Sequence, residues 1–164
     1  MRREAEFTEF VAARRPRLRR LAYALCGDWH TADDIVQTAL AKLYVAWPKV
    51  HRQGAMDAYC VRIIARVRID EHRRVWGRET PGLDGFDLAS RETDPALRPD
   101  LVRALAALPE MQRKVVVLRH WWGLSVAEAA DQLGIGVGTV KSHSSRALAR
   151  LAVLMSDSHE GATS

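Results

Sequence analysis

Four polar residues near the end of the chain have types and spacing suited to nucleic-acid recognition: Lys141, Ser142, Ser145 and Arg146. At about 100° per residue they fall on the side of a helix opposite Val140. Lysine and arginine donate to phosphates and to guanine edges, and short serine side chains leave room for close approach. The pattern therefore favours a helix in the major groove of DNA, and an ordinary solvated helix face is the alternative.

A helix-turn-helix pattern precedes this face. Ser125 is a predicted N-cap, and Glu128 three residues later would complete a capping box. The first helix is expected to bury Ala127, Ala130 and Leu133. Gly134 can adopt the left-handed conformation that ends a helix, so the second helix is expected to begin near Gly138 or Thr139. The second helix is expected to bury Val140, Ser144, Ala147, Leu151 and Leu154.

A second polar cluster contains Asp33, Asp34, Gln37 and Thr38. It opens a strongly periodic helix predicted over residues 31–47, with Thr31 as its cap and Pro48 as its end. The two aspartates either complement the helix dipole or form, with Gln37 and Thr38, a surface for a protein partner. Together with His30 they could also hold a metal in a helical enzyme. The sequence offers no nucleophile–base pair and no phosphate-binding glycine loop, so we expect no catalytic residue.

The two cysteines, Cys26 and Cys60, are too few for a disulfide framework. Cys26 and His30 have no second ligand pair at suitable spacing, so we expect no metal and no cofactor. Charged residues follow Met1 instead of an apolar run, and no window reaches the roughly 18 apolar residues of a membrane span. These observations predict a protein of the cytoplasm without membrane insertion.

The 164 residues are 48% hydrophobic and 27% charged, and their periodicity is helical throughout. A first helix is expected over residues 4–26, with a kink or a break into two helices at Pro16. A basic loop over 49–57 and an arginine-rich helix over 57–76 follow the second helix. The basic helix suits either a phosphate backbone or solvent.

The net charge of +5 favours a polyanionic partner, and its distribution divides the chain. Residues 77–100 contain three basic and six acidic residues with several glycines and prolines, which predicts a flexible acidic linker. Asp100 is the expected cap of the next helix, and Pro109 the start of another. The sequence thus predicts an all-α protein with domains at 1–76 and 101–155 and a frayed tail at 156–164.

In this order, the segments resemble a bacterial sigma factor of the extracytoplasmic-function (ECF) type. The matching stretches in the first half are Ala32-Asp33-Asp34-Ile35-Val36-Gln37 and Ile69-Asp70-Glu71-His72-Arg73-Arg74. Those in the second half are Leu108-Pro109-Glu110-Met111-Gln112-Arg113 and Gly138-Thr139-Val140-Lys141-Ser142. The resemblance implies a domain two before the linker and a domain four, with the helix-turn-helix, after it.

The resemblance also implies a role for each cluster. Asp33, Asp34, Gln37 and Thr38 would bind core RNA polymerase. Val50, His51, Arg52 and Gln53 would capture a flipped base of the −10 element, and Arg62 and Arg66 would hold the melted strand. Thr139, Lys141, Ser142, Ser145 and Arg146 would read the −35 element. Promoter DNA and core polymerase are the implied partners, and an anti-sigma factor is a candidate partner.

Two residues depart from the pattern of many relatives. Val67 stands where they carry asparagine, and His143 where they carry arginine, which suggests a promoter sequence particular to this chain. A free-standing helix-turn-helix regulator, binding duplex DNA without polymerase, is the alternative function.

Overall fold

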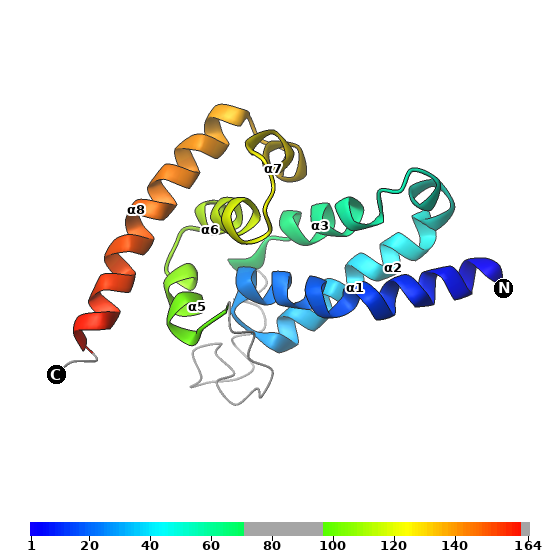
Figure 1. Cartoon of the computed structure of the whole chain (residues 1–164), viewed down its shortest axis with the longest axis horizontal. Helices are drawn as coiled ribbons and strands as arrows, with labels where there is room; N and C mark the ends of the chain where they lie inside the picture. The colour runs from blue at the N-terminus through cyan, green and yellow to red at the C-terminus, as the bar shows by residue number, and fades with distance from the viewer. Residues whose placement is uncertain (71–96, 162–164) are drawn as a thin grey trace.

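The computed structural model describes residues 1–70 and 97–161, and all regular structure within these ranges is helical. The first range forms α1 (Arg2–Cys26), α2 (Trp29–Arg52) and α3 (Met56–Arg66). The second forms α5 (Pro99–Ala106), α6 (Glu110–Val116), the π-helical turn η1 (Val117–Trp121), α7 (Val126–Leu133) and α8 (Val137–Gly161). The two groups lie against each other, with α8 along the outer side of the second group (Figure 1). The all-α prediction is confirmed for the described residues, whereas most of the predicted linker lies outside them.

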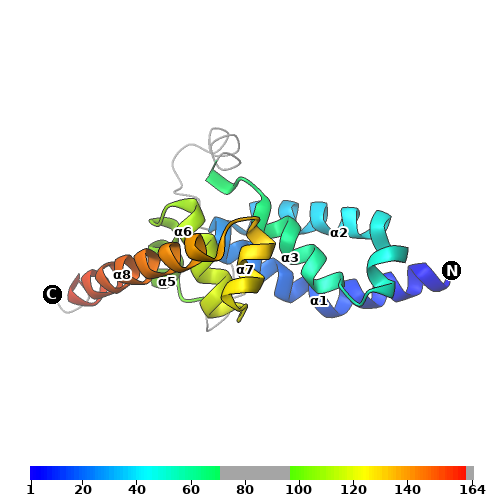
Figure 2. The ribbon, with the colours of Figure 1, turned by 90° about the horizontal axis from the view of Figure 1, so that it is seen from above.

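Helices α1 and α2 form an antiparallel pair because each carries a continuous apolar stripe (Figures 1 and 2). Leu18, Leu21 and Leu25 of α1 are fully buried against this partner and α3. Gly27 ends α1 in the left-handed conformation at φ 74°, which turns the chain directly into α2. The stacked rings of Tyr23 and Trp29, with centroids 3.8 Å apart, close this corner.

Neither proline breaks or ends its helix, in contrast to the predicted break at Pro16 and the predicted end at Pro48. Helix α1 passes through Pro16 as one element, and α2 passes through Pro48 to Arg52. A proline at position 48 deprives the Tyr44 carbonyl of its normal donor. The Arg3 guanidinium of α1 donates to that carbonyl instead, at 2.5 Å. A distant side chain therefore allows α2 to continue, and the predicted loop over 49–57 shrinks to residues 53–55.

Two other boundaries in the first half also differ. Asp28, not Thr31, caps α2: its carboxylate accepts from the backbone and the hydroxyl of Thr31, at 2.9 and 2.6 Å. Helix α3 ends at Arg66, because Val67 adopts an extended conformation, and the chain is helical again at residues 69–70, so the predicted helix over 57–76 is interrupted. The backbone carbonyl of Val67 there accepts from Lys114 of α6, which favours this early end. Residues 71–76 lie outside the described ranges.

The second group packs around α6 and η1, whose Val115 and Leu118 are completely buried. Helix α8 contributes Val140 and Ala147 to this core, as predicted, whereas Ser144, Leu151 and Leu154 are partly exposed. The first turn of α5 starts with Pro99, so Arg98 takes the cap position predicted for Asp100. A membrane span would need a longer apolar helix than any in residues 1–70 and 97–161.

Two further features of the second group differ from the predictions. In α7 the predicted core residues Ala130 and Leu133 are buried, together with Ala129, whereas Ala127 is exposed. Helix α8 begins at Val137 and extends to Gly161, so it includes residues 156–161 of the predicted tail. Nothing in this segment breaks a helix before the glycine, and the Ser156 hydroxyl donates back to the Ala152 carbonyl at 2.8 Å.

Candidate nucleic-acid interface

Helix α7 and the turn that orients α8 are held by contacts between residues close together in the sequence. The Ser125 hydroxyl accepts from the Glu128 amide, and the Ser125 amide donates to the Glu128 carboxylate, both at 3.0 Å. These bonds to Ser125 lower the pKa of the Glu128 carboxyl. Gly134 ends α7 at φ 68°, and α8 starts four residues after α7 ends. The predicted capping box and glycine turn are both confirmed.

The outward face of α8 presents all the residues predicted to read DNA. Thr139, Lys141, Ser142, Ser145 and Arg146 are exposed, whereas Val140 and Ala147 on the opposite face are fully buried. Helix α8 packs against α6 through that buried face. Ser144 lies at the border, where its hydroxyl is 3.1 Å from Nε2 of His120. The result is a helix with a fixed buried side and a free polar side.

Arg62 and Arg66 point away from the core of the first group, but each contacts α7. Arg62 donates to the Asp131 carboxylate at 2.8 Å. Arg66 donates to the backbone carbonyls of Gln132 and Asp131, at 2.8 and 3.0 Å. Both guanidinium groups are thus occupied by oxygen acceptors from the helix-turn-helix.

The segment predicted to capture a base is more helical and more buried than expected. Val50 is only 6% exposed and packs in the core, so the structure gives its side chain no access to a ligand. His51 stacks on Trp47 with ring centroids 4.8 Å apart. Arg52 and Gln53 are exposed at the end of α2, where Arg52 also donates to the Pro48 carbonyl at 3.0 Å. His51, Arg52 and Gln53 remain available for contact.

The polar patch on α2 is partly committed to structure. Asp33 forms a 2.6 Å ion pair with Arg19, whose guanidinium lies 4.4 Å from the centre of the Trp29 ring. Asp33 and Asp34 are half-buried, and Gln37 and Thr38 are exposed. No group of three histidine, cysteine, aspartate or glutamate side chains within the described ranges could hold a metal ion. Cys26 and Cys60 are buried thiols that are not joined in a disulfide, and burial, with a smaller effect of Asp57, raises the pKa of Cys60 to about 12.

A buried ionic cluster on α6, formed by Glu110, Arg113 and Lys114, was not predicted from the sequence. Arg113 and Lys114 are only 2% and 4% exposed. Arg113 donates to the carbonyls of Leu105 and Leu108 at 2.9 and 3.0 Å. The only sequence signal was two basic residues leading directly into the apolar run from Val115 to Leu118.

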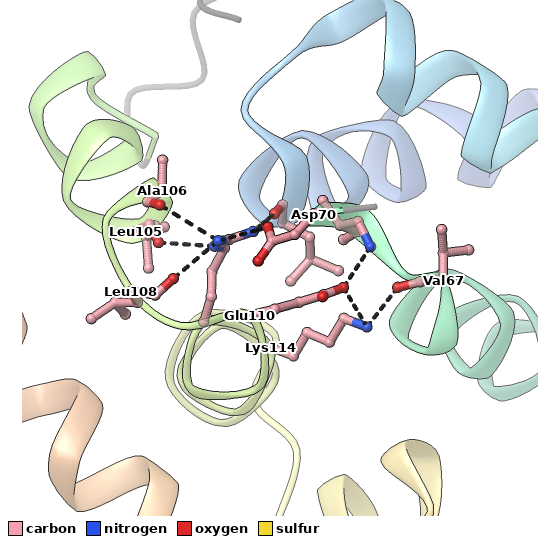
Figure 3. Close-up of polar contacts among 10 residues, drawn as sticks. Val67, Asp70, Leu105, Ala106, Leu108, Glu110 and Lys114 are labelled. Carbon is pink, nitrogen blue, oxygen red and sulfur yellow. Dashed lines mark hydrogen bonds and ion pairs between the residues drawn. The ribbon is translucent and has the colours of Figure 1, made fainter. Parts of the chain in front are cut away.

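The same cluster also reaches the first group of helices (Figure 3). Arg113 donates to the Leu25 carbonyl at the end of α1, at 2.9 Å, and forms a 3.2 Å ion pair with Asp70. Lys114 donates to the Val67 carbonyl at 2.6 Å. Burial lowers the pKa of Lys114, while Glu110, 3.2 Å away, opposes that shift. The Glu110 carboxylate in turn accepts from the Ile69 amide.

Comparison with known proteins matches each half of the chain to a protein family. Residues 10–78 match the family Sigma-70 region 2, and residues 98–151 match Sigma-70, region 4. The chain is 39% identical to the RNA polymerase sigma-E factor of Streptomyces coelicolor over 151 residues, covering 89% of this chain and 84% of that protein. It is 32% identical to the ECF RNA polymerase sigma factor SigM of Mycobacterium tuberculosis, covering 91% of this chain and 76% of that protein.

Among solved structures, the chain resembles the sigma factor RpoE of Bartonella quintana, which was crystallised with the anti-sigma factor NepR. The TM-score is 0.70 at 30% identity, over 92% of this chain and 97% of that one. The fold also resembles CnrH, solved in complex with the cytosolic domain of CnrY, with a TM-score of 0.63 at 24% identity, over 94% of this chain and 90% of that one. Two matched sigma regions in the right order, with near-full-length relatives, establish that the chain belongs to the ECF sigma factors of bacterial RNA polymerase.

Proposed function

We propose that this sigma factor directs promoter-specific transcription initiation through three surfaces of its own. The first, on α8, reads the −35 element. The second, on α3 and the end of α2, holds the −10 element. The third, on α2, binds core polymerase. The exposed polar face of α8, set by the Ser125 cap and the Gly134 turn, is the observation that carries the proposal.

The α8 face supports base-specific contact because its residues differ in what they can donate. Arg146 can pair with a guanine edge through two parallel hydrogen bonds, and Lys141 can neutralise a phosphate. Ser142 and Ser145 are small enough to leave the helix close to the groove floor. None of these side chains is needed for packing, since the core of this group is formed from the opposite face.

The −10 surface consists of His51, Arg52, Gln53, Arg62 and Arg66. Their guanidinium groups, ring and amide can stack on or hydrogen-bond to unpaired bases and hold a single strand. Val50 is left out because its side chain is buried. The core-binding surface is centred on Gln37 and Thr38, which are exposed, with Asp34 at its edge and Asp33 held by Arg19.

The chain acts as an initiation factor and performs no catalysis itself. Its partners are core polymerase and promoter DNA, and it works in the cytoplasm, where both are found. Since the RpoE relative was solved with an anti-sigma factor, we propose that a protein of this class also restrains the present chain. A free-standing regulator is not favoured, because region 2 as well as region 4 is matched.

The test of the α8 assignment is selection of duplexes from a pool randomised across the −35 block, using polymerase reconstituted with each variant. Arg146→Ala is expected to lose roughly 1–3 kcal/mol of discrimination at one or two adjacent positions. Arg150→Ala, which removes an exposed arginine one turn further along α8, is the control and should leave the preferred sequence unchanged. An Arg146→Ala selection identical to that of the unmodified protein would refute the role of this residue.

A further inference from the structure

The first turns of α1 lie beside the end of α2, which carries His51 of the proposed −10 surface (Figures 1 and 2). Phe7 of α1 meets the rings of Tyr44 and Trp47 edge to face, with centroids 5.0 and 5.4 Å apart. Trp47 is only 2% exposed, so these rings belong to the core. The Arg3 guanidinium donates to the Tyr44 carbonyl and lies 4.7 Å from the centre of the Tyr44 ring. Helix α1 therefore holds the last turns of α2 in place.

The His51 ring has a defined orientation at this corner. Its plane lies 19° from that of the Trp47 ring, with centroids 4.8 Å apart. Its Nδ1 is 4.0 Å from Oε2 of Glu6, whereas Oε1 of Glu6 is 3.2 Å from Nε of Arg2. The His51 side chain is still 41% exposed. One ring nitrogen thus lies near a carboxylate of α1, while the ring remains accessible to a ligand.

The position of this carboxylate affects which nitrogen of His51 carries the proton. A neutral imidazole has one N–H group that donates and one bare nitrogen that accepts. The negative charge of Glu6 favours the proton on Nδ1, the nitrogen that faces it. At 4.0 Å this preference is electrostatic, because the distance exceeds that of a hydrogen bond. Nε2 of His51 is then left as an acceptor.

An accepting Nε2 can distinguish between unpaired bases. Adenine and cytosine carry an exocyclic amino group that donates, at N6 and N4, whereas guanine and thymine present the acceptors O6 and O4 at the corresponding positions. A bare Nε2 can bond to the amino groups and is repelled by the two oxygens. A base turned out of the stack leaves this edge free to be read. The tautomer of His51 therefore determines which bases suit it.

We propose that Glu6 is a positioning residue for −10 recognition, which sets the His51 ring so that Nε2 accepts from the amino group of an adenine or cytosine. This inference deepens the proposed function and rests on the role given there to His51. Glu6 acts through His51 and has no contact with DNA of its own. Its side chain is 34% exposed, so its charge can be removed without disturbing the core below it.

The tautomer is measured on the free chain by ¹⁵N NMR of the histidine rings, at a pH where His51 is neutral. This method distinguishes a ring nitrogen that carries a proton from a bare one, and His51→Asn identifies the His51 signals among those of the six histidines. The unmodified chain should carry the proton mainly on Nδ1. Glu6→Gln should shift the tautomer ratio toward Nε2 by about fivefold, the size expected for a partly exposed charge. Glu9→Gln removes an exposed carboxylate about one turn further along α1 and should leave the ratio unchanged.

The base preference is measured by selection from promoters randomised across the −10 block, with polymerase reconstituted from each variant. The unmodified chain and Glu9→Gln should prefer adenine or cytosine to guanine or thymine at one position. Glu6→Gln should weaken this preference by about the same factor as it shifts the tautomer ratio. His51→Ala should abolish the preference at that position.

The possible failures are separable. A proton mainly on Nε2 in the unmodified chain, or a tautomer ratio that Glu6→Gln does not change, would overturn the effect of Glu6 on the ring. A shifted ratio with an unchanged base preference, or a preference for guanine or thymine that depends on His51, would refute reading by a bare Nε2. If His51→Ala leaves the selected −10 sequence unchanged at every position, the fault lies in the proposed function of His51.

Discussion

Replacing Arg113 by methionine should destabilise the chain more than any surface substitution, because this arginine satisfies carbonyl groups at the ends of two helices. It lies 2% exposed and donates to Leu105, Leu108 and Leu25 within 3.0 Å. The last carbonyls of a helix have no partner within the helix, and their dipole favours a cation. Arg113 therefore links the ends of α1 and α5 through one buried charge.

The size of the effect follows from what methionine leaves behind. Methionine fills most of the volume of the arginine stem but donates no hydrogen bond. Each hydrogen bond from a charged group contributes about 1.5–3 kcal/mol, and each buried carbonyl left unpaired costs about 1–3 kcal/mol. These contributions overlap, so we expect a total loss near the ~3–5 kcal/mol measured when one partner of a buried ionic cluster is removed.

Urea unfolding followed by circular dichroism measures this loss through the transition midpoint. Arg98→Met is the matched control, since Arg98 is a 57% exposed arginine whose ion pair with Asp100 contributes at most about 1 kcal/mol. A loss for Arg113→Met no larger than that for Arg98→Met would show that the buried bonds do not stabilise the fold.

Three further perturbations test other parts of the account. Gln37→Arg should abolish co-purification with core polymerase while the melting temperature is unchanged, and retained binding would contradict the α2 surface. Gly134→Ala should destabilise the helix-turn-helix by about 1–2 kcal/mol because φ is 68° there, and an unchanged thermal midpoint would contradict the need for glycine. The Cys60 thiol stays protonated in the folded chain up to a pKa of about 12, against 9.0 when exposed. Between these two pKa values the Cys60 thiol ionises only in the unfolded chain. The free energy of unfolding should therefore fall by about 1.4 kcal/mol per pH unit relative to Cys60→Ala, and parallel pH dependences of unfolding for the two proteins would contradict this.

Helix α8 and the turn before it were predictable because their sequence signals are local. Ser125, Glu128 and Gly134 act within one turn of each other, and the polar and apolar faces of α8 follow from residue type at helical spacing. The order of the helices within the described residues depends on the same short-range periodicity.

The incorrect predictions concern residues whose contact partners lie far away in the sequence. Pro48 does not end α2 because Arg3, 41 positions away along the chain, supplies a donor to the freed carbonyl. Arg113 looks like an ordinary surface residue until α1 brings the Leu25 carbonyl, 88 positions away, within reach. The helix that continues to Arg52 also explains why Val50 is buried. Neither the hydrophobic periodicity of the sequence nor residue propensity predicts these contacts, since they arise only when the helices pack.

The most direct test of the central claim is run-off transcription with core polymerase that lacks a sigma factor. The purified chain is added to this core on a library of genomic fragments from its own host. The account predicts new transcripts with discrete start sites, each preceded by a shared pair of sequence blocks. The absence of transcripts and of any complex with core, while the chain alone shifts duplex DNA, would contradict it and favour a free-standing regulator.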